Sequence, residues 1–191
     1  MSFFFTDGDL SGSLETAEAE VWLATEFTVP AGNANKFRWR FPAIPSGVTP
    51  LMRLFNAGGT ALAIGPASAT TLAFDTSTND AWNNATPPAP VALSAGTYRA
   101  TINTTRYVFI GSFFAGGPIT RAGVTAVQSR FGSPGSAPAS TSNTLYTPDM
   151  DFTATAGGLA VTVWNGSTEV AATVTVWNGS AEVAASISGV V

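Results

Sequence analysis

Residues 36–41 show the most regular alternation of polar and apolar side chains in the chain. Three basic residues fall on one face of an extended strand and three aromatic residues on the other: Lys36, Arg38 and Arg40 against Phe37, Trp39 and Phe41. Period-two alternation is typical of an antiparallel strand with one buried face. Because an aromatic side chain buries about 150–250 Å², we expect the aromatic face to supply much of a core.

Short apolar segments separated by turn formers continue through residues 1–154. They predict strands at 3–5, 21–29, 51–55, 60–64, 71–74, 91–93, 97–103, 106–113 and 146–153. Glycine-containing turns predict hairpins over 51–64 and 91–103. Of the remaining stretches, 10–20 is expected to hold one helical turn, and 79–89 and 132–144 are expected to be loops. The pattern at 118–130 does not distinguish a strand from a loop. The pattern favours an all-β fold, an antiparallel β-sandwich of jelly-roll type, over residues 1–154.

The last part of the chain, residues 155–191, carries a tandem repeat. VTVWNGSTEVAA at 161–172 returns as VTVWNGSAEVAA at 174–185. An Asn-Gly pair between alternating apolar residues is a strong hairpin signal, so we expect a three-stranded β-meander or β-spiral. Two-residue turns would place Val161 opposite Val170 and Val163 opposite Thr168. The central strand would run from 168 to 177.

The predicted meander has one Val/Ala face and one face of Thr, Glu and Trp. A thin sheet of this kind is marginal in water, and its open edges favour association. We expect the extension to oligomerise the chain, as a homotrimer that buries the apolar faces together. The alternative is that the meander packs on its own sandwich. The expected subunit contacts are Val161, Val163, Val170, Val174, Val176, Val183 and Ile187.

Composition limits the chemistry that the chain can perform. The 191 residues include no Cys and no His, which excludes thiol nucleophiles, Cys/His zinc sites and imidazole bases. The start has no basic region and an apolar run of only three residues, so no signal peptide is expected. No apolar run is long enough for a membrane helix. We expect synthesis in a cytoplasm, no membrane insertion and no cofactor.

Charge is unevenly distributed along the chain. Residues 1–35 carry six acids and no base, residues 36–130 carry all eight bases and two acids, and residues 131–191 carry four acids and no base. Two interpretations remain open: chance placement on solvated faces, or complementarity between segments or subunits. Because the bases are scattered among predicted strands, a nucleic-acid partner is not expected.

The acidic residues include close pairs, which could serve as metal ligands or catalytic groups. Asp149 and Asp151, two apart in a predicted strand, point to one face and are candidates for Ca²⁺ binding or a glycosidase pair. The competing interpretation, that they are solvated turn or edge acids, is the one that we expect. No catalytic residue and no metal site is therefore assigned. Trp82, in a predicted loop, is the candidate for stacking on a glycan.

Several stretches, in order, resemble a known family. They are LATEFTV (23–29), LFNAGGTALA (54–63), WNNATPPAPVALSAGTYRATI (82–102) and YTPDMDF (146–152). Together they are similar to a β-sandwich domain of unknown function found in actinobacterial secreted proteins and in tail proteins of phages that infect those bacteria. The V-T-V-W-N-G tail resembles C-terminal repeats of minor tail proteins in such phages. The family has no established catalytic residues.

The resemblance implies a structural protein of the virion, a minor tail protein of a tailed actinobacteriophage that is not an enzyme. Its partners would be other copies of itself, other virion proteins and a host envelope glycan. A head decoration or head-fibre protein is the alternative within the virion. A stand-alone carbohydrate-binding module is the alternative from another class.

Overall fold

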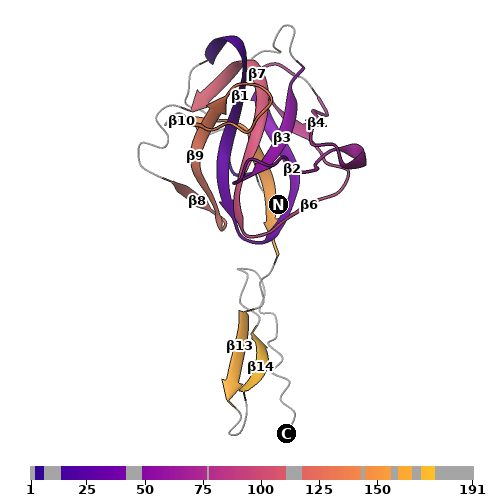
Figure 1. Cartoon of the computed structure of the whole chain (residues 1–191), viewed down its shortest axis with the longest axis vertical. Helices are drawn as coiled ribbons and strands as arrows, with labels where there is room; N and C mark the ends of the chain where they lie inside the picture. Colours follow the sequence, from indigo (N-terminus) through magenta and orange to yellow (C-terminus); the bar gives the residue numbers. More distant parts are fainter. Residues whose placement is uncertain are drawn as a thin grey trace. The chain divides into compact units, whose positions relative to one another are not determined.

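The computed structural model describes residues 3–6, 14–41, 49–76, 78–110, 118–142, 145–155, 159–164 and 169–174. The chain divides into two compact units, Met1–Thr155 and Ala156–Val191. In the first unit the described strands form two antiparallel β-sheets packed together (Figure 1), which confirms the expected all-β sandwich. Within the described residues, no helix has the length and apolar character that a membrane crossing requires.

The larger sheet is built around two long strands, β1 (Leu14–Val29) and β7 (Gly96–Ile110), which pair with each other. β9 (Val124–Gly132) lies on the other side of β1, and β3 (Leu51–Asn56) on the other side of β7. Four short strands complete the sheet: β4 (Leu72–Ala73) on β3, β8 (Ile119–Arg121) and β10 (Ser140–Ser142) on β9, and β11 (Leu145–Tyr146) on β7.

The smaller sheet has β2 (Gly32–Phe41) at its centre. β12 (Asp149–Ala154) pairs with one side of β2, whereas β5 (Ala81–Ala85) and β6 (Val91–Leu93) pair with the other. β12 is therefore an edge strand, and among the described residues its outer side carries one isolated bridge, from Asp151 to Phe3. This edge positions the site described below.

The alternation in β2 sorts its side chains as expected. Phe37 and Trp39 are fully buried, while Lys36 is exposed. Phe37 belongs to the main core cluster, which also contains Phe4 and Phe5. Trp39 belongs to a second cluster, together with Leu23, Ile102 and Tyr146. The side chain of Phe41 lies outside the described residues.

Two of the expected local structures are wrong. The helical turn expected within 10–20 is instead the start of β1, because residues from Leu14 onward pair with β7. The loop expected at 79–89 contains β5. Asn83 in β5 is fully buried, and its side-chain amide is bonded to Thr76, Thr78 and Ala81. A buried asparagine satisfied in this way interrupts the apolar pattern without interrupting the strand.

Of the two expected hairpins, the one over 91–103 is wrong. β6 pairs with β2 and β7 pairs with β1, so the turn at 94–95 leads from one sheet to the other. The one over 51–64 is present but shorter than expected, with the amide of Leu62 bonded to the carbonyl of Leu54 and Phe55 bridged to Ala61. This isolated bridge stands in place of the strand expected at 60–64. The segment 118–130, whose pattern did not distinguish a strand from a loop, holds the β8–β9 hairpin, with Ala122 and Gly123 at positive φ in its turn. The loop expected at 132–144 contains β10.

The described part of the second unit is a hairpin of β13 (Leu159–Trp164) and β14 (Glu169–Val174). Its register pairs Val161 with Ala172 and Val163 with Val170. The expected pairing, Val161 with Val170 and Val163 with Thr168, is therefore wrong by two residues, because four residues rather than two separate the paired ends. Since side chains alternate with period two, a slip of two residues leaves every position on its expected face.

Candidate functional site

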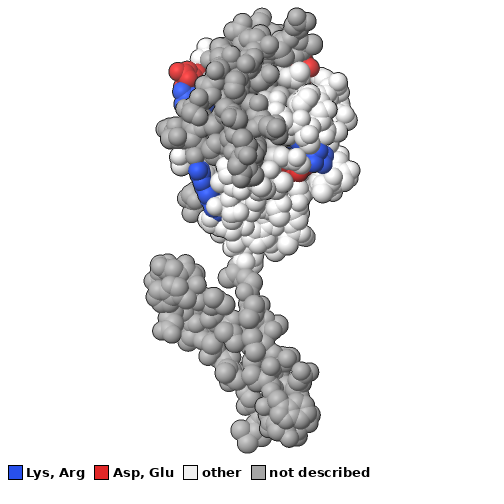
Figure 2. All heavy atoms as spheres, turned by 90° about the vertical axis from the view of Figure 1, so that its left-hand side faces the viewer, with Lys and Arg blue, Asp and Glu red and all other residues white. Residues whose placement is uncertain are grey.

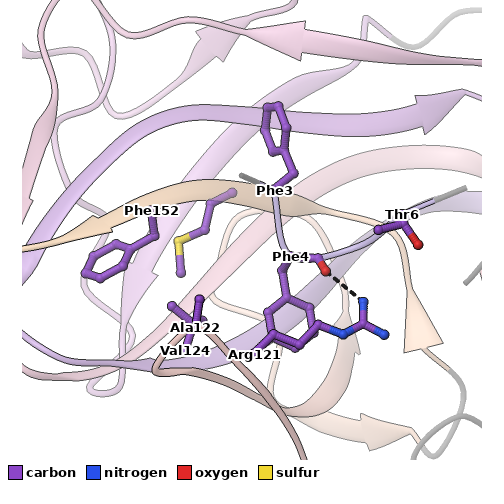
Figure 3. A pocket seen from close by; sticks show the side chains of 8 residues that line it. Phe3, Phe4, Thr6, Arg121, Ala122, Val124 and Phe152 are labelled. Atoms are coloured by element: carbon purple, nitrogen blue, oxygen red, sulfur yellow. Dashed lines mark hydrogen bonds between the residues drawn. The ribbon is translucent and has the colours of Figure 1, made fainter. Parts of the chain in front are cut away.

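A pocket of about 380 Å³ lies where the edge of the smaller sheet meets the β8–β9 turn. Its lining residues come from the Phe3–Thr6 segment, from the β8–β9 hairpin and from β12: Phe3, Phe4, Thr6, Arg121, Ala122, Val124, Met150 and Phe152. Figure 3 shows the rings of Phe3 and Phe4 projecting in opposite directions from the segment, with Phe4 toward Arg121. The pocket is thus mostly apolar, with one guanidinium at its rim.

The Phe3–Thr6 segment is held by its main chain. The amides of Phe4 and Phe5 each donate to the Asp149 carboxylate, at 3.1 Å to Oδ1 and 3.1 Å to Oδ2. The carbonyl of Phe4 accepts a hydrogen bond of 2.9 Å from Arg121 Nη1, and that of Phe5 accepts one from Arg38 Nη2. Three side chains of the sandwich therefore meet four backbone groups of two consecutive residues.

The Asp149 carboxylate at the centre of this clamp is completely buried. Burial raises the pKa of Asp149 to about 6, and the Arg38 charge with the amide hydrogen bonds opposes that rise. Arg38 Nε donates to Oδ2 at 3.1 Å, and the amide of Met150 donates to Oδ1 at 2.7 Å. The expectation of a solvated edge acid is wrong for Asp149, because the Phe3–Thr6 segment supplies the amides that replace water.

The Arg38 guanidinium is stacked between two aromatic rings. Its carbon lies 3.9 Å from the centre of the Phe3 ring and 4.0 Å from the centre of a Trp82 ring. Trp82 lies in β5 rather than in the expected loop, and it is half-buried against the core. One face of the indole is therefore occupied by Arg38, which leaves less of it for the stacking on a sugar that the sequence suggested.

Asp151 lies two residues along β12 from Asp149 and is also buried, with 5% of its surface exposed. Its backbone partner on β2 is Lys36, and its Oδ1 has no hydrogen-bond partner. The described residues contain no group of three or more His, Cys, Asp or Glu side chains placed to share a metal ion. Because Asp149 is committed to four donors, the two carboxylates do not form a cation site or a glycosidase pair in this geometry.

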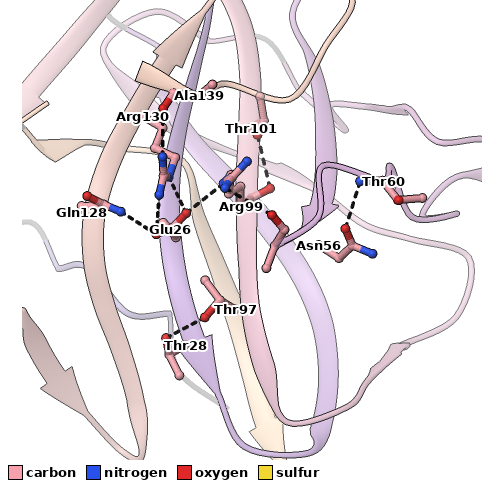
Figure 4. Close-up of polar contacts among 11 residues, drawn as sticks. Glu26, Thr28, Asn56, Thr60, Thr97, Arg99, Thr101, Gln128, Arg130 and Ala139 are labelled. Atoms are coloured by element: carbon pink, nitrogen blue, oxygen red, sulfur yellow. Dashed lines mark hydrogen bonds and ion pairs between the residues drawn. The ribbon is translucent and has the colours of Figure 1, made fainter. Parts of the chain in front are cut away.

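A third buried carboxylate, missed by the sequence analysis, lies on the larger sheet. Glu26 of β1 accepts hydrogen bonds from Arg99 Nε (2.8 Å), Gln128 Nε2 (2.7 Å) and Arg130 (Figure 4). Burial raises the pKa of Glu26, but the bonds from Arg130, Arg99 and Gln128 outweigh it and leave that pKa below its usual range. The signal was a single acid within the apolar predicted strand 21–29, and the strands on both sides of it supply arginines.

The two clusters join the acidic ends of the chain to its basic middle. Glu26 belongs to the acidic start of the chain and Asp149 to its acidic end, and both pair with arginines of the basic middle. Complementarity between segments, one of the two open interpretations, thus operates inside the chain. On the face of the molecule that Figure 2 shows, the described surface is mostly neutral, with separate small charged areas.

The expected subunit contacts divide into two groups. Val161, Val163, Val170 and Val174 lie at positions of the β13–β14 hairpin that share one face by register. Val176, Val183 and Ile187 lie outside the described residues, as does the expected third strand. The structure therefore brings together the first four residues and does not bear on the other three.

Comparisons with known proteins give no relative for this chain: no family model, no curated protein and no solved structure matches it. The function must therefore be argued from the residues and their arrangement.

Proposed function

We propose that the protein is a structural, non-enzymatic component of a phage virion, a minor tail protein that acts by assembling with copies of itself. The observation that carries the proposal is the register of the β13–β14 hairpin. It gives one face only apolar positions, which are Leu159, Val161, Val163, Val170, Ala172 and Val174. The opposite face holds Ala160, Thr162, Trp164, Glu169, Ala171 and Thr173.

A two-stranded hairpin with one apolar face is marginal in water unless something covers that face. Three copies around an axis would cover three such faces at once, which favours a homotrimer. The resemblance to phage tail proteins and their V-T-V-W-N-G repeats supports placement in a tail. Asp149 and Glu26 are both bound by arginines, an arrangement that suits stability more than acid–base catalysis.

The test compares two substitutions in the full chain that add one negative charge to the same strand. Val163→Asp lies on the apolar face and Thr162→Asp on the opposite face. Light scattering of the unchanged protein should give three times the chain mass of 19.6 kDa. Val163→Asp should give monomers, and Thr162→Asp should remain trimeric. A monomeric unchanged protein, or equal effects of the two variants, would contradict the role of this face in assembly.

Placement in the virion needs a separate measurement. Antibody labelling of particles from the phage that encodes the chain should mark the tail, with a low copy number by densitometry. Labelling of the head with hundreds of copies would instead indicate the head decoration protein that the sequence left as the alternative. Absence from particles would refute a virion role altogether.

A further inference from the structure

The Phe3–Thr6 segment occupies its site in the manner of a bound peptide. Its backbone contacts reach residues that are remote in sequence, with Phe4 bonded to Asp149 145 positions away and to Arg121 117 positions away. Its side chains fill the core, where Phe4 is 5% and Phe5 is 1% exposed. Main-chain hydrogen bonds combined with pockets for side chains are the general mode by which a sheet edge takes up an extended peptide.

The acceptor for this segment is an open sheet edge. β12 is the outermost strand of the smaller sheet, and Phe3 is joined to it by the isolated bridge to Asp151. An edge strand presents unpaired amides and carbonyls to any extended chain that reaches it. The acceptor residues Asp149, Arg38 and Arg121 bind backbone atoms of the segment, and the two arginines also lie over the rings of Phe3 and Phe4.

Specificity comes from the two buried phenylalanines. Phe4 packs edge-on against Phe5 at 5.0 Å and against Phe27 of β1 at 5.5 Å between ring centres. Phe5 lies 6.1 Å from Phe27. The site therefore selects an extended segment with two consecutive aromatic residues. In the chain the matching sequence, Phe3-Phe4-Phe5, stands before a polar stretch with two glycines, residues 7–13.

We propose that the β12 edge, with Asp149, Arg38 and Arg121, is a binding site for an extended Phe-Phe peptide, and that neighbouring copies of this chain exchange the Phe3–Thr6 segment through it. A second copy offers an identical segment, so every contact of the site is kept when the segment is exchanged. Exchange of identical elements is a low-cost route to association, because it needs only a change in the connection. The connecting residues 7–13 can span about 23–25 Å when extended.

The experiment traps exchange by crosslinking between single-cysteine chains, which is clean because the protein has no cysteine. Thr6→Cys marks the segment and Ala122→Cys marks the acceptor, since both residues line the same pocket and are exposed. The two full-length variants, one carrying a mass tag, are refolded together and treated with a flexible bismaleimide. When the segment of one copy lies in the site of the other, the two cysteines of this pair come together on different chains and give a crosslinked heterodimer.

The matched control replaces Ala122→Cys by Thr141→Cys, an exposed position on β10. This pair reports association through any other surface, including the C-terminal repeats. We expect the Thr6/Ala122 pair to give about tenfold more heterodimer than the control pair.

Two further arms make the outcome decisive. Excess of a synthetic peptide, SFFFTDGD, should suppress the heterodimer, whereas the same peptide with its phenylalanines changed to serine should not. A chain carrying both cysteines reports whether the segment reaches its own site. If that chain crosslinks only internally and the mixed pair stays at the control level, each copy keeps its own segment and exchange is refuted. That result would leave the assembly role of the β13–β14 face untouched.

Discussion

Glu26 and Asp149 are two buried carboxylates of one sandwich, yet their environments shift their pKa values in opposite directions. Glu26 accepts from three side chains, two of them arginines, and its pKa lies below the usual range. Asp149 has one arginine and three backbone amides, and burial raises its pKa to about 6. Burial raises the pKa of both groups, but the bonds from two arginines and Gln128 outweigh it at Glu26, whereas one arginine and the amides do not outweigh it at Asp149.

The difference has a structural origin. Glu26 lies in β1, between two strands that each supply an arginine from the face of a continuous sheet. Asp149 lies on an edge strand, where the neighbour is a four-residue segment that supplies amides and aromatic rings instead of a second cation. A full positive charge offsets the desolvation of a carboxylate more effectively than amide dipoles do. Glu26 is thus ionised at neutral pH, while the pKa of Asp149 lies at about 6.

The largest expected effect comes from removing Glu26. Glu26→Ala leaves Arg99 and Arg130 on the sheet without their shared anion, and breaking a buried ion pair from one side costs about 3–5 kcal/mol. Urea unfolding, followed by tryptophan fluorescence, should show this loss at neutral pH. Gln128→Ala, which removes one neutral donor from the same carboxylate, should cost about 1 kcal/mol. Equal losses would mean that the arginines find other partners.

The next effect is a pH dependence that belongs to Asp149. Its pKa rises from a usual value of 3.8 to about 6 on folding, so the folded protein takes up a proton between these values. The contribution of Asp149 is fully present below pH 4 and is lost as pH rises to 6, which lowers the free energy of unfolding by about 3 kcal/mol.

This pH dependence can be isolated by a difference measurement. The unfolding free energy of the unchanged protein minus that of Asp149→Asn should decrease between pH 4 and pH 6 and stay constant above. For Glu26, whose pKa is lowered, the same difference against Glu26→Gln should change in the opposite direction and decrease as pH falls. Two difference curves of the same sign would refute the contrast between the carboxylates.

A smaller effect is expected for Arg38→Lys. Lysine keeps the charge beside Asp149, but it loses the planar group that stacks on Phe3 and Trp82 and donates to Phe5. Arginine and lysine are not equivalent at stacked sites, so we expect a loss of about 1–2 kcal/mol. The control is Arg40→Lys on the same strand, whose partner Asp80 is 77% exposed. It should change stability by less than about 0.5 kcal/mol.

The sequence was sufficient for the sandwich and for the buried face of β2, since apolar alternation reports burial directly. It failed where polar residues are buried. The polar residue Asn83 made the stretch that forms β5 resemble a loop. It is buried in a strand because its amide is bonded to neighbouring backbone and hydroxyl groups. Asp149 looked like an edge acid, because the residues that cover it lie at the other end of the sequence. Hydropathy does not record such remote partners.

Local turn signals were similarly limited. The turn before Gly96 marks a change of direction, but nothing near it tells whether the next strand joins the same sheet; β6 and β7 join different ones. In the repeat, the Asn-Gly pair suggested a two-residue turn, and the pairing observed for Val163 differs by two residues. The separation of the two faces was preserved, because it depends only on whether a position is odd or even.

The contact between Phe4 and Asp149 also has a consequence for the order of folding. The aromatic residues at 3–5 are synthesised before every strand of the sandwich, yet their partner on β12 follows 145 positions later. Closing so long a loop is slow compared with pairing neighbouring strands. During synthesis the three phenylalanines therefore have no binding site until the sandwich is almost complete. Until then they are accessible to chaperones and to other nascent chains.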